Sequence, residues 1–540
     1  MLAAGRAAGN LIGRQLLLPV KTRPRAPPRS YTAPGPSGPA PHGATAISRP
    51  DIQHRRTKIV CTLGPATESH DQIAALVEAG MDVARLNFSH QTIDWHRQRA
   101  ALVRQISEEV DRPIGLLQDL PGPKVRVGEM PEDGAELIAG RQFLLRMQEE
   151  PGSAEQVSVN YAGLSDELEI GDPILLADGS IRLRVAAIEA DTVICDVQIG
   201  GKLYSHQGLN LPTRSLQLPA LTAFDRQALV AGLEMGVDYA ALSFVRTGDD
   251  VTEARRLIDE HGLQLPIIAK IEKHEALDNL EEIVEAVDGL MVARGDLAVE
   301  IPLEDVPQAQ KRIIRTANAA AKPVITATQM LRSMVDSPRP SRAETTDVAN
   351  ALYDGTDAVM LSEETAVGHY AVDAVEVMAR ICHATEKTMC ERGTRRPLPE
   401  GRRHIVPDAV AAAACLLARH LDAAALVVPT RTGSTAIKIA ACRPRQPIVA
   451  IGTHAEAVGR MTLVWGVIPV IGQELEAYEA MLVEAEQRAE AAGLVEPGDL
   501  LIITAGFPVG GPGSTNTVTA KVAGERLITY SLDQNPASRR

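Results

Sequence analysis

The sequence predicts an α/β protein: a (β/α)8 TIM barrel interrupted by a small β-barrel lid domain and followed by a C-terminal α/β domain. Eight short apolar segments that alternate with helical segments predict the barrel. Between residues 121 and 220 helical periodicity is lost, and short alternating runs separated by turn residues predict the lid. Strand and helix signals resume after about residue 390 and predict the last domain.

The predicted barrel strands lie on both sides of the β insert. The first ends at Gly64 and Pro65, and a helix over Ser69–Ala79 follows, ended by Gly80. The eight segments are 57–62, 83–87, 114–119, 239–243, 266–270, 289–293, 323–327 and 358–361. The resulting domains are 51–120 with 221–390 for the barrel, 121–220 for the lid and 391–540 for the C-terminal domain.

The first 50 residues differ from the rest. They contain seven basic residues, nine prolines and no acidic residue. Such a segment cannot bury enough apolar surface to fold. Two interpretations remain open: an organelle transit peptide, and a disordered extension or a start codon placed too far upstream. The expected location is cytoplasmic, or a mitochondrion or plastid if the segment is a transit peptide.

Composition excludes several classes of function. The formal charge of −14 argues against a surface for nucleic acid. No apolar run is long enough to predict a membrane span. The six cysteines show no paired spacing, which indicates a reducing compartment without a disulfide framework or a thiolate zinc site.

Polar residues follow the predicted barrel strands where strands end and loops begin, which is where barrels carry their active sites. Glu272 and Asp296 are two carboxylates from neighbouring strands, and magnesium favours such a pair, leaving the rest of its shell for water and phosphate. Arg85 offers a fork of donors for phosphate oxygens. Lys270 stands two residues before Glu272 and suits charge that develops on a transferring phosphoryl group or an enolate. Asp119, which ends the third predicted strand, is a fifth such residue. Any one of these is more often a structural ion pair, but five at successive strand ends are not.

Seven motifs resemble the pyruvate kinase family, in the family's order and spacing, over nearly all of residues 55–530. A single motif of this kind is weak, whereas seven in order are specific. They are residues 56–66 (RTKIVCTLGPA), 84–90 (ARLNFSH), 270–275 (KIEKHE), 291–300 (MVARGDLAVE), 327–331 (ATQML), 338–344 (PRPSRAE) and 360–366 (MLSEETA).

The resemblance implies phosphoryl transfer from phosphoenolpyruvate to ADP, giving pyruvate and ATP, with Mg2+ as cofactor. It implies that Lys270 neutralises the phosphoryl group in flight and that Arg85 binds its oxygens. It assigns Glu272 and Asp296 to magnesium, and Gly295, Asp296 and Thr328 to the substrate carboxylate and methylene carbon. The nucleotide is assigned to Asn87, Ser89, His90 and Arg126, and the insert is expected to close over the cleft as a lid.

Two departures from the family concern the lid and potassium. Gln207 stands where many relatives carry a lysine that reaches the nucleotide, and His206 is a partial substitute. Relatives resemble one another in a potassium site that matches Asn87, Ser89 and Asp119 with a threonine, whose position here is Leu120. Lys124 replaces a glutamate of the potassium-dependent relatives, so we expect its ammonium to replace potassium, which is then not required. The alternative is that Lys124 points to solvent.

A second phosphate site is predicted in the C-terminal domain. Thr430, Arg431, Thr432, Gly433, Ser434 and Thr435 follow a strand and precede a helical run, and hydroxyls with backbone amides at a helix start form a phosphate cradle. The loop is similar to the family's site for a sugar-phosphate effector, and the glycine-rich segment 506–515 is expected to cover it. The alternative is a well-capped helix. A homotetramer is expected from the resemblance alone.

Two other functions compete with this assignment. A magnesium-dependent aldolase or lyase that stabilises an enolate uses a similar carboxylate pair, but it leaves residues 85–90 without a purpose. An inactive regulatory homologue should have lost Lys270, Glu272, Asp296 or Thr328, and all four are present.

Overall fold

The computed structural model describes residues 55–212, 216–391, 405–508 and 515–525. The predicted N-terminal extension at residues 1–50 lies outside this part of the chain. None of the described helices is both long and apolar enough to cross a membrane.

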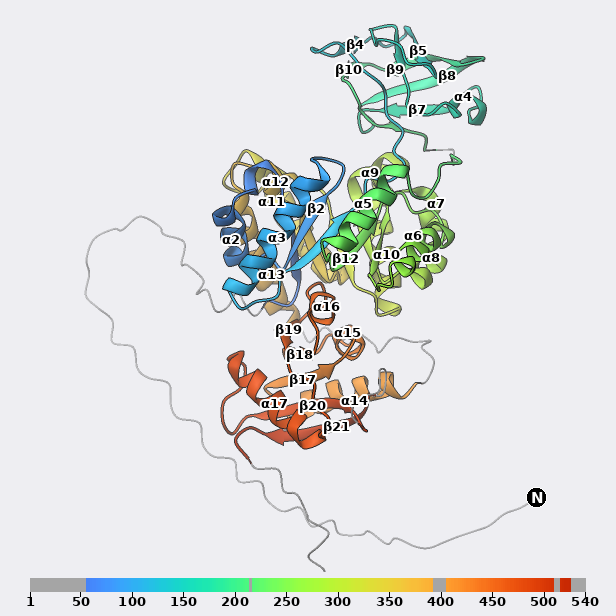
Figure 1. Ribbon diagram of the computed structural model, residues 1–540. Coiled ribbons are helices and arrows are strands. Elements are labelled where there is room, and N and C mark those ends of the chain that lie inside the picture. Colours follow the sequence, from blue (N-terminus) through green and yellow to red (C-terminus); the bar gives the residue numbers. More distant parts are fainter. Residues whose placement is uncertain (1–54, 213–215, 392–404, 509–514, 526–540) are drawn as a thin grey trace, which may run out of the picture. The chain divides into compact units, whose positions relative to one another are not determined.

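Eight parallel strands form a closed barrel, as the sequence predicts (Figure 1). Each strand pairs with two neighbours in the order β1-β16-β15-β14-β13-β12-β3-β2. Nearly every strand residue is buried, as expected of parallel strands covered on both faces. The strands are β1 (Lys58–Thr62), β2 (Val83–Asn87), β3 (Gly115–Asp119), β12 (Tyr239–Leu242), β13 (Ile267–Ile271), β14 (Gly289–Ala293), β15 (Val324–Ala327) and β16 (Ala358–Leu361).

Helices follow the barrel strands, and their apolar faces share a core with the outward-facing strand residues. The predicted helix over Ser69–Ala79 is present as α2, and Ser69 caps it: the Ser69 hydroxyl accepts the Gln72 amide, and Gln72 Oε1 accepts the Ser69 amide. The helices are α2 (His70–Ala79), α3 (Ile93–Glu109), α5 (Ala223–Glu234), α6 (Asp249–Glu260), α7 (His274–Asp278), α8 (Leu280–Ala286), α9 (Arg294–Glu300), α10 (Val306–Ala319), α11 (Arg342–Asp354), α12 (Glu363–Ala366) and α13 (Ala371–Glu391), with 3-10 turns at Pro65–Thr67, Leu303–Asp305 and Arg332–Val335.

The insert is a β domain with its own core, which surrounds the fully buried Phe143. Its strands form a six-stranded sheet in the order β11-β7-β8-β9-β5-β6 and a β10-β4 pair. They are β4 (Ala135–Leu137), β5 (Gln142–Arg146), β6 (Gln156–Ser158), β7 (Pro173–Leu176), β8 (Ile181–Glu189), β9 (Thr192–Ile199), β10 (Gly201–Leu203) and β11 (Leu209–Asn210), with the short helix α4 (Leu164–Glu167).

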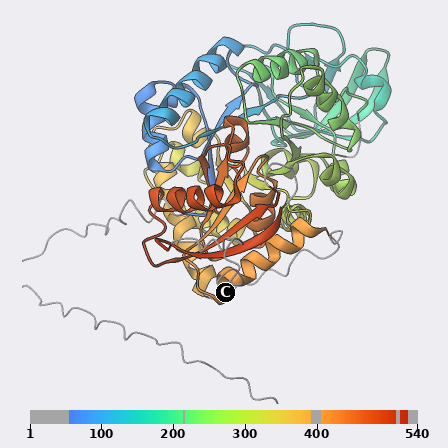
Figure 2. The same cartoon turned by 60° about the horizontal axis from the view of Figure 1, so that its bottom comes forward.

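The C-terminal domain, orange to red in Figures 1 and 2, is built on a five-stranded sheet in the order β19-β18-β17-β20-β21. All pairs are parallel except β20 with β21. The elements are α14 (Val406–His420), β17 (Ala425–Thr430), α15 (Ser434–Ala441), β18 (Ile448–Gly452), α16 (Ala455–Gly459), β19 (Val467–Ile471), α17 (Tyr478–Ala491), β20 (Leu500–Gly506) and β21 (Thr515–Val522).

The interior of the barrel is closed at one end by a side chain from the C-terminal domain. Leu463 is 1% exposed and packs in one cluster with Val60, Tyr239 and Met291, which point inward from their strands. The Tyr239 hydroxyl donates to the Gly459 carbonyl and accepts the Leu463 amide, both at 3.3 Å. The loop after α16 therefore completes the core of the barrel.

Asp82, which precedes β2, ties the first two strands together. Its carboxylate accepts from the buried Arg55 guanidinium and from the Ile59 amide, each at 2.8 Å. Burial alone would raise the pKa of Asp82, but the charges of Arg55, Lys58 and Arg112 outweigh it and lower the pKa. Asp82 is therefore ionised in the folded protein at neutral pH.

We expect Asp82→Asn to lower the free energy of unfolding by about 3 kcal/mol, because it leaves buried cations without their counter-charge. Urea denaturation at pH 7 followed by circular dichroism measures this difference. The folded-state pKa is depressed, so the stabilisation is present above the ordinary aspartate pKa and is lost as pH falls through the folded-state pKa. The difference from the wild type should therefore shrink in acid. Asp259→Asn, at an exposed position on α6, is the control and should change stability by no more than about 0.5 kcal/mol.

Candidate active site

The carboxyl ends of β2, β3 and β13 bring two cations and two carboxylates together in a buried network. Arg85 Nε donates to Asp119 Oδ2 at 2.7 Å, and Lys270 Nζ lies 3.2 Å from Asp119 Oδ1. Lys270 Nζ also lies 2.9 Å from Glu272 Oε1. Asp119 and Glu272 are each 1% exposed. The predicted grouping of Arg85, Asp119, Lys270 and Glu272 at one edge of the barrel is what the structure shows.

Lys270 is held as a cation. Burial opposes the charged form, but the carboxylates of Asp119 and Glu272 outweigh it and raise the pKa of Lys270. Burial would likewise raise the pKa of Asp119, yet Arg85 and Lys270 lower it. Lys270 can therefore supply a fixed positive charge at neutral pH.

Two residues outside the prediction complete this network. The Lys270 ammonium donates to Ser243 Oγ at 2.6 Å, and Ser243 Oγ donates to the Leu120 carbonyl at 2.7 Å. Arg85 donates to Thr62 Oγ1 at 2.9 Å. Both hydroxyls stand at or just beyond the end of a barrel strand. That position is the only feature of the sequence from which their place in the site could have been predicted.

Each of the two carboxylates assigned to a metal forms an ion pair with a lysine. Glu272 Oε1 contacts Lys270, while Oε2 accepts the Phe244 amide at 2.8 Å. Asp296, in the first turn of α9, accepts Lys124 Nζ at 2.8 Å. Burial raises the pKa of Glu272, and the negative charge of Asp296 raises it further despite Lys270. The charge of Asp296 is therefore felt at Glu272.

Thr328 follows β15 directly and contacts α9 through its side chain. Its φ is +68° and that of Gln329 is +55°. Both values lie in the left-handed region, which is strained for residues other than glycine and most of all for a β-branched residue such as threonine. Thr328 Oγ1 accepts the Gly295 amide at 2.9 Å and donates to the Ala327 carbonyl at 2.7 Å. Gly295, Asp296 and Thr328 thus lie together, as predicted.

The segment assigned to the nucleotide follows β2. The Ser89 amide donates to Asn87 Oδ1 at 3.2 Å, and His96 Nε2 pairs with the His90 carbonyl at 2.9 Å. Burial lowers the pKa of His90, and the charges of Arg126 and then Arg85 lower it further. Arg126 therefore lies near His90, and the four predicted residues border one region.

His96, which was not predicted, anchors this segment. It stacks on Phe88 with ring centroids 4.1 Å apart. Burial lowers the pKa of His96 to about 4, so the ring is neutral at pH 7. A histidine on a helix gives no sequence signal that distinguishes this role from ordinary packing.

Gln207 and His206, where the lid sequence differs from the family, form side-chain hydrogen bonds with other residues of the lid. Gln207 Oε1 accepts the Tyr204 amide at 2.9 Å. His206 Nε2 pairs with Glu129 at 3.0 Å, and the His206 carbonyl accepts Arg126 at 3.0 Å. His206 thus contacts Arg126 through its backbone, while its ring contacts Glu129.

The predicted effector loop lies between β17 and α15. Gly433 has a φ of +83°, and its amide donates to Thr430 Oγ1 at 3.0 Å. The Ser434 amide lies 3.4 Å from Thr432 Oγ1, and Thr435 Oγ1 shares a 2.6 Å hydrogen bond with the Thr515 hydroxyl of β21. Arg431 pairs with Glu474 at 3.5 Å. Most of the predicted covering segment, residues 509–514, lies outside the described residues.

The chain matches two family models, the barrel domain of pyruvate kinase over residues 54–375 and the alpha/beta domain of pyruvate kinase over residues 408–520. It is 44% identical to "Pyruvate kinase" of Geobacillus stearothermophilus over 476 residues, which cover 88% of this chain and 81% of that protein. Against "Pyruvate kinase 2" of a Synechocystis species the identity is 44% over 474 residues, or 87% and 79% of the two chains. The chain belongs to the pyruvate kinase family. The predicted resemblance and enzyme class are thereby confirmed.

Proposed function

We propose that this pyruvate kinase family member transfers the phosphoryl group of phosphoenolpyruvate to ADP at the site described above. The bond between phosphorus and the enol oxygen of the substrate breaks, and the phosphoryl group goes to the terminal phosphate oxygen of ADP. The resulting enolate takes a proton from solvent water at its methylene carbon to give pyruvate. The observation that supports this most directly is Lys270, which is buried between Asp119 and Glu272 in the same network as Arg85.

Glu272 and Asp296 fit a magnesium ion, because magnesium in proteins is commonly held by one or two carboxylates and completes its shell with water and phosphate oxygens. Bound there, Mg2+ would neutralise phosphate charge and align the oxygens of the reactants. Without a metal, Lys124 compensates the charge of Asp296 and Lys270 that of Glu272.

Residues of this chain can bind the phosphoryl group, stabilise the developing charge and position the rest of the substrate. The Arg85 guanidinium can offer donors to the phosphoryl oxygens while Asp119 fixes its plane. Lys270 supplies positive charge where the bridging oxygen gains negative charge. The amides of Gly295 and Asp296, at the start of α9, suit the substrate carboxylate. The Thr328 hydroxyl beside them suits the face of the methylene carbon.

We expect Lys270→Met to reduce turnover by roughly 10³-fold while leaving substrate and metal binding largely intact, because its charge matters most in the transition state. A coupled assay with phosphoenolpyruvate and ADP gives the rate, and protection against thermal unfolding by phosphoenolpyruvate gives binding. Lys311→Met, at a half-exposed position on α10, is the matched control and should keep its rate. Retention of even a tenth of the wild-type rate in Lys270→Met would contradict the assignment.

We also propose that activity does not require potassium. Three features support this. Leu120, at the position of the missing hydroxyl ligand, is buried and apolar. Asp119, one of the remaining ligands, is already neutralised by Arg85 and Lys270. The Lys124 ammonium lies near the predicted site, because it donates to Asp296 and lies 5.8 Å from the centre of the Phe244 ring.

The wild type should be nearly as active with tetramethylammonium as its only monovalent cation as in potassium chloride of equal ionic strength. Lys124→Glu should lose activity in the potassium-free buffer and recover incompletely in potassium, because Leu120 still lacks a hydroxyl. Initial rates at saturating magnesium and both substrates measure the comparison. Strong stimulation of the wild type by potassium would rule the proposal out.

A phosphorylated metabolite is proposed to regulate the enzyme through the loop from Thr430 to Thr435. The hydroxyls of Thr430 and Thr432 and the amides at the start of α15 converge there, which suits a phosphate group. Homotetrameric assembly and a cytoplasmic location are further proposals. The first rests on the family resemblance and the second on the cysteine pattern, since none of the six cysteines, all of which lie in the described residues, forms a disulfide.

Thr432→Glu with Ser434→Glu should abolish activation by the effector and leave the rate at saturating substrate unchanged, because added negative charge opposes a bound phosphate. A panel of sugar phosphates and nucleoside monophosphates, assayed at subsaturating phosphoenolpyruvate, measures the effect. Thr432→Val with Ser434→Ala separates the loss of hydroxyls from the added charge. Activation that survives in the acidic variant would place the effector elsewhere, and activation of neither protein would remove the hypothesis.

A further inference from the structure

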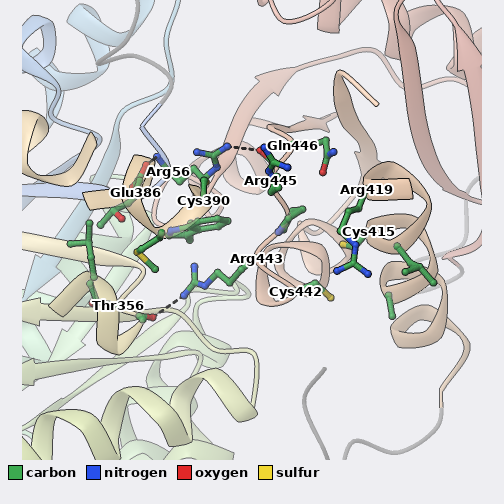
Figure 3. A pocket seen from close by; sticks show the side chains of 18 of the residues that line it. Arg56, Thr356, Glu386, Cys390, Cys415, Arg419, Cys442, Arg443, Arg445 and Gln446 are labelled. Atoms are coloured by element: carbon green, nitrogen blue, oxygen red, sulfur yellow. Dashed lines mark hydrogen bonds between the residues drawn. The ribbon is translucent and has the colours of Figure 1, made fainter. Parts of the chain in front are cut away.

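A large cavity lies away from both sites described so far. It has a volume of about 630 Å³ and is lined by residues of the barrel and of the C-terminal domain (Figure 3). The barrel contributes Tyr353 at the end of α11 and Glu386 on α13, and the C-terminal domain contributes Arg419 on α14 and Trp465 before β19. No residue of the active site or of the segment 430–435 lines it.

Trp465 and two arginines form one wall of this cavity. The Arg443 guanidinium lies 4.6 Å from the centre of the Trp465 ring, and that of Arg56 lies 5.9 Å from it. Arg443 also pairs with Asp357 at 2.9 Å and donates to the Gly355 carbonyl at 2.9 Å. The wall is therefore held in place by contacts that do not involve a ligand.

The charge of the lining is unbalanced. Four arginines face the cavity (Arg56, Arg419, Arg443 and Arg445) against a single carboxylate, Glu386. That carboxylate is already used, because its two oxygens accept the amides of Arg56 and Thr57 at 3.0 and 2.7 Å. Within the part of the chain that the structure describes, the guanidiniums of Arg419 and Arg445 make no hydrogen bond or ion pair. The cavity therefore favours an anion.

The remaining lining is partly apolar, beside polar side chains such as those of Thr57, Thr356 and Gln446. Leu352, Met389, Ala412 and Leu416 contribute side chains without polar atoms, and they lie on α11, α13 and α14. An inorganic anion alone leaves such a surface in contact with water, whereas a ring covers it and can stack on the guanidinium and indole planes. The volume is in the range of pockets that bind small organic ligands.

We propose that this cavity binds a small organic anion that carries a planar ring, with the anionic group on Arg419 and Arg445 and the ring against the Trp465 wall. The site is separate from the active site and from the loop at 430–435, and it joins the barrel to the C-terminal domain.

The test uses the fluorescence of Trp465, since the chain has two tryptophans and Trp95→Phe leaves only this one. The probes are adenosine 5'-monophosphate and phenyl phosphate, each with a ring and a phosphate. Inorganic phosphate and adenosine, which carry one feature each, are the comparators. Both ring phosphates should change the fluorescence saturably, and each comparator should bind at least about tenfold more weakly, because it forgoes one set of contacts.

Arg419→Ala should weaken both ring phosphates by about tenfold, the scale of one charge-assisted hydrogen bond. Arg256→Ala, at an exposed arginine of α6, is the matched control and should leave binding unchanged. The acidic variant at Thr432 and Ser434 should also bind normally. Isothermal titration calorimetry of the same proteins supplies an affinity that is independent of fluorescence.

Absence of saturable binding by either ring phosphate would overturn the proposal. So would binding that Arg419→Ala leaves unchanged, or binding that the acidic variant at Thr432 and Ser434 abolishes, because the ligand would then lie elsewhere. Equal affinity for inorganic phosphate would show a simple anion site and refute the role of the ring.

Discussion

The cation–carboxylate network of Arg85, Asp119, Lys270 and Glu272 is the constraint on which the catalytic end of the barrel depends. Two cations buried near each other repel, and each is tolerable only because a carboxylate stands between or beside them. The same arrangement keeps Lys270 charged and fixes the Arg85 plane. The site is thus organised before any phosphate arrives, and substrate exchanges one set of ionic partners for another.

Most of the fold was predictable because each barrel strand is a short, mainly apolar run, and helical segments alternate with these runs. The site was predictable for a related reason: in a parallel barrel all carboxyl ends meet at one rim, so Arg85, Asp119 and Lys270 could be brought together without knowing any side-chain direction. The bounds of β1 and α2 differ from the predicted ones by a single residue.

What the sequence could not supply was contact between side chains far apart in the chain. Lys124 was expected near the potassium region, yet its ammonium reaches Asp296, and this pairing depends on how the hinge of the lid folds back. Ser243 gives no sign that it will hold Lys270. The cavity beside Trp465 combines residues from positions 56 to 465, and no local pattern relates Arg56 to Arg443.

Leu463 and Tyr239 show that the lid and the C-terminal domain differ in how they depend on the barrel core. The lid has its own hydrophobic core, which includes Phe143 and contains no barrel residue. The C-terminal domain instead supplies a side chain to the interior of the barrel, and the Tyr239 hydroxyl has its partners there. Excising that domain would open the barrel floor to water and orphan a buried phenol. The barrel of this chain therefore depends on the C-terminal domain for part of its core, and any attempt to isolate it has to replace that contact.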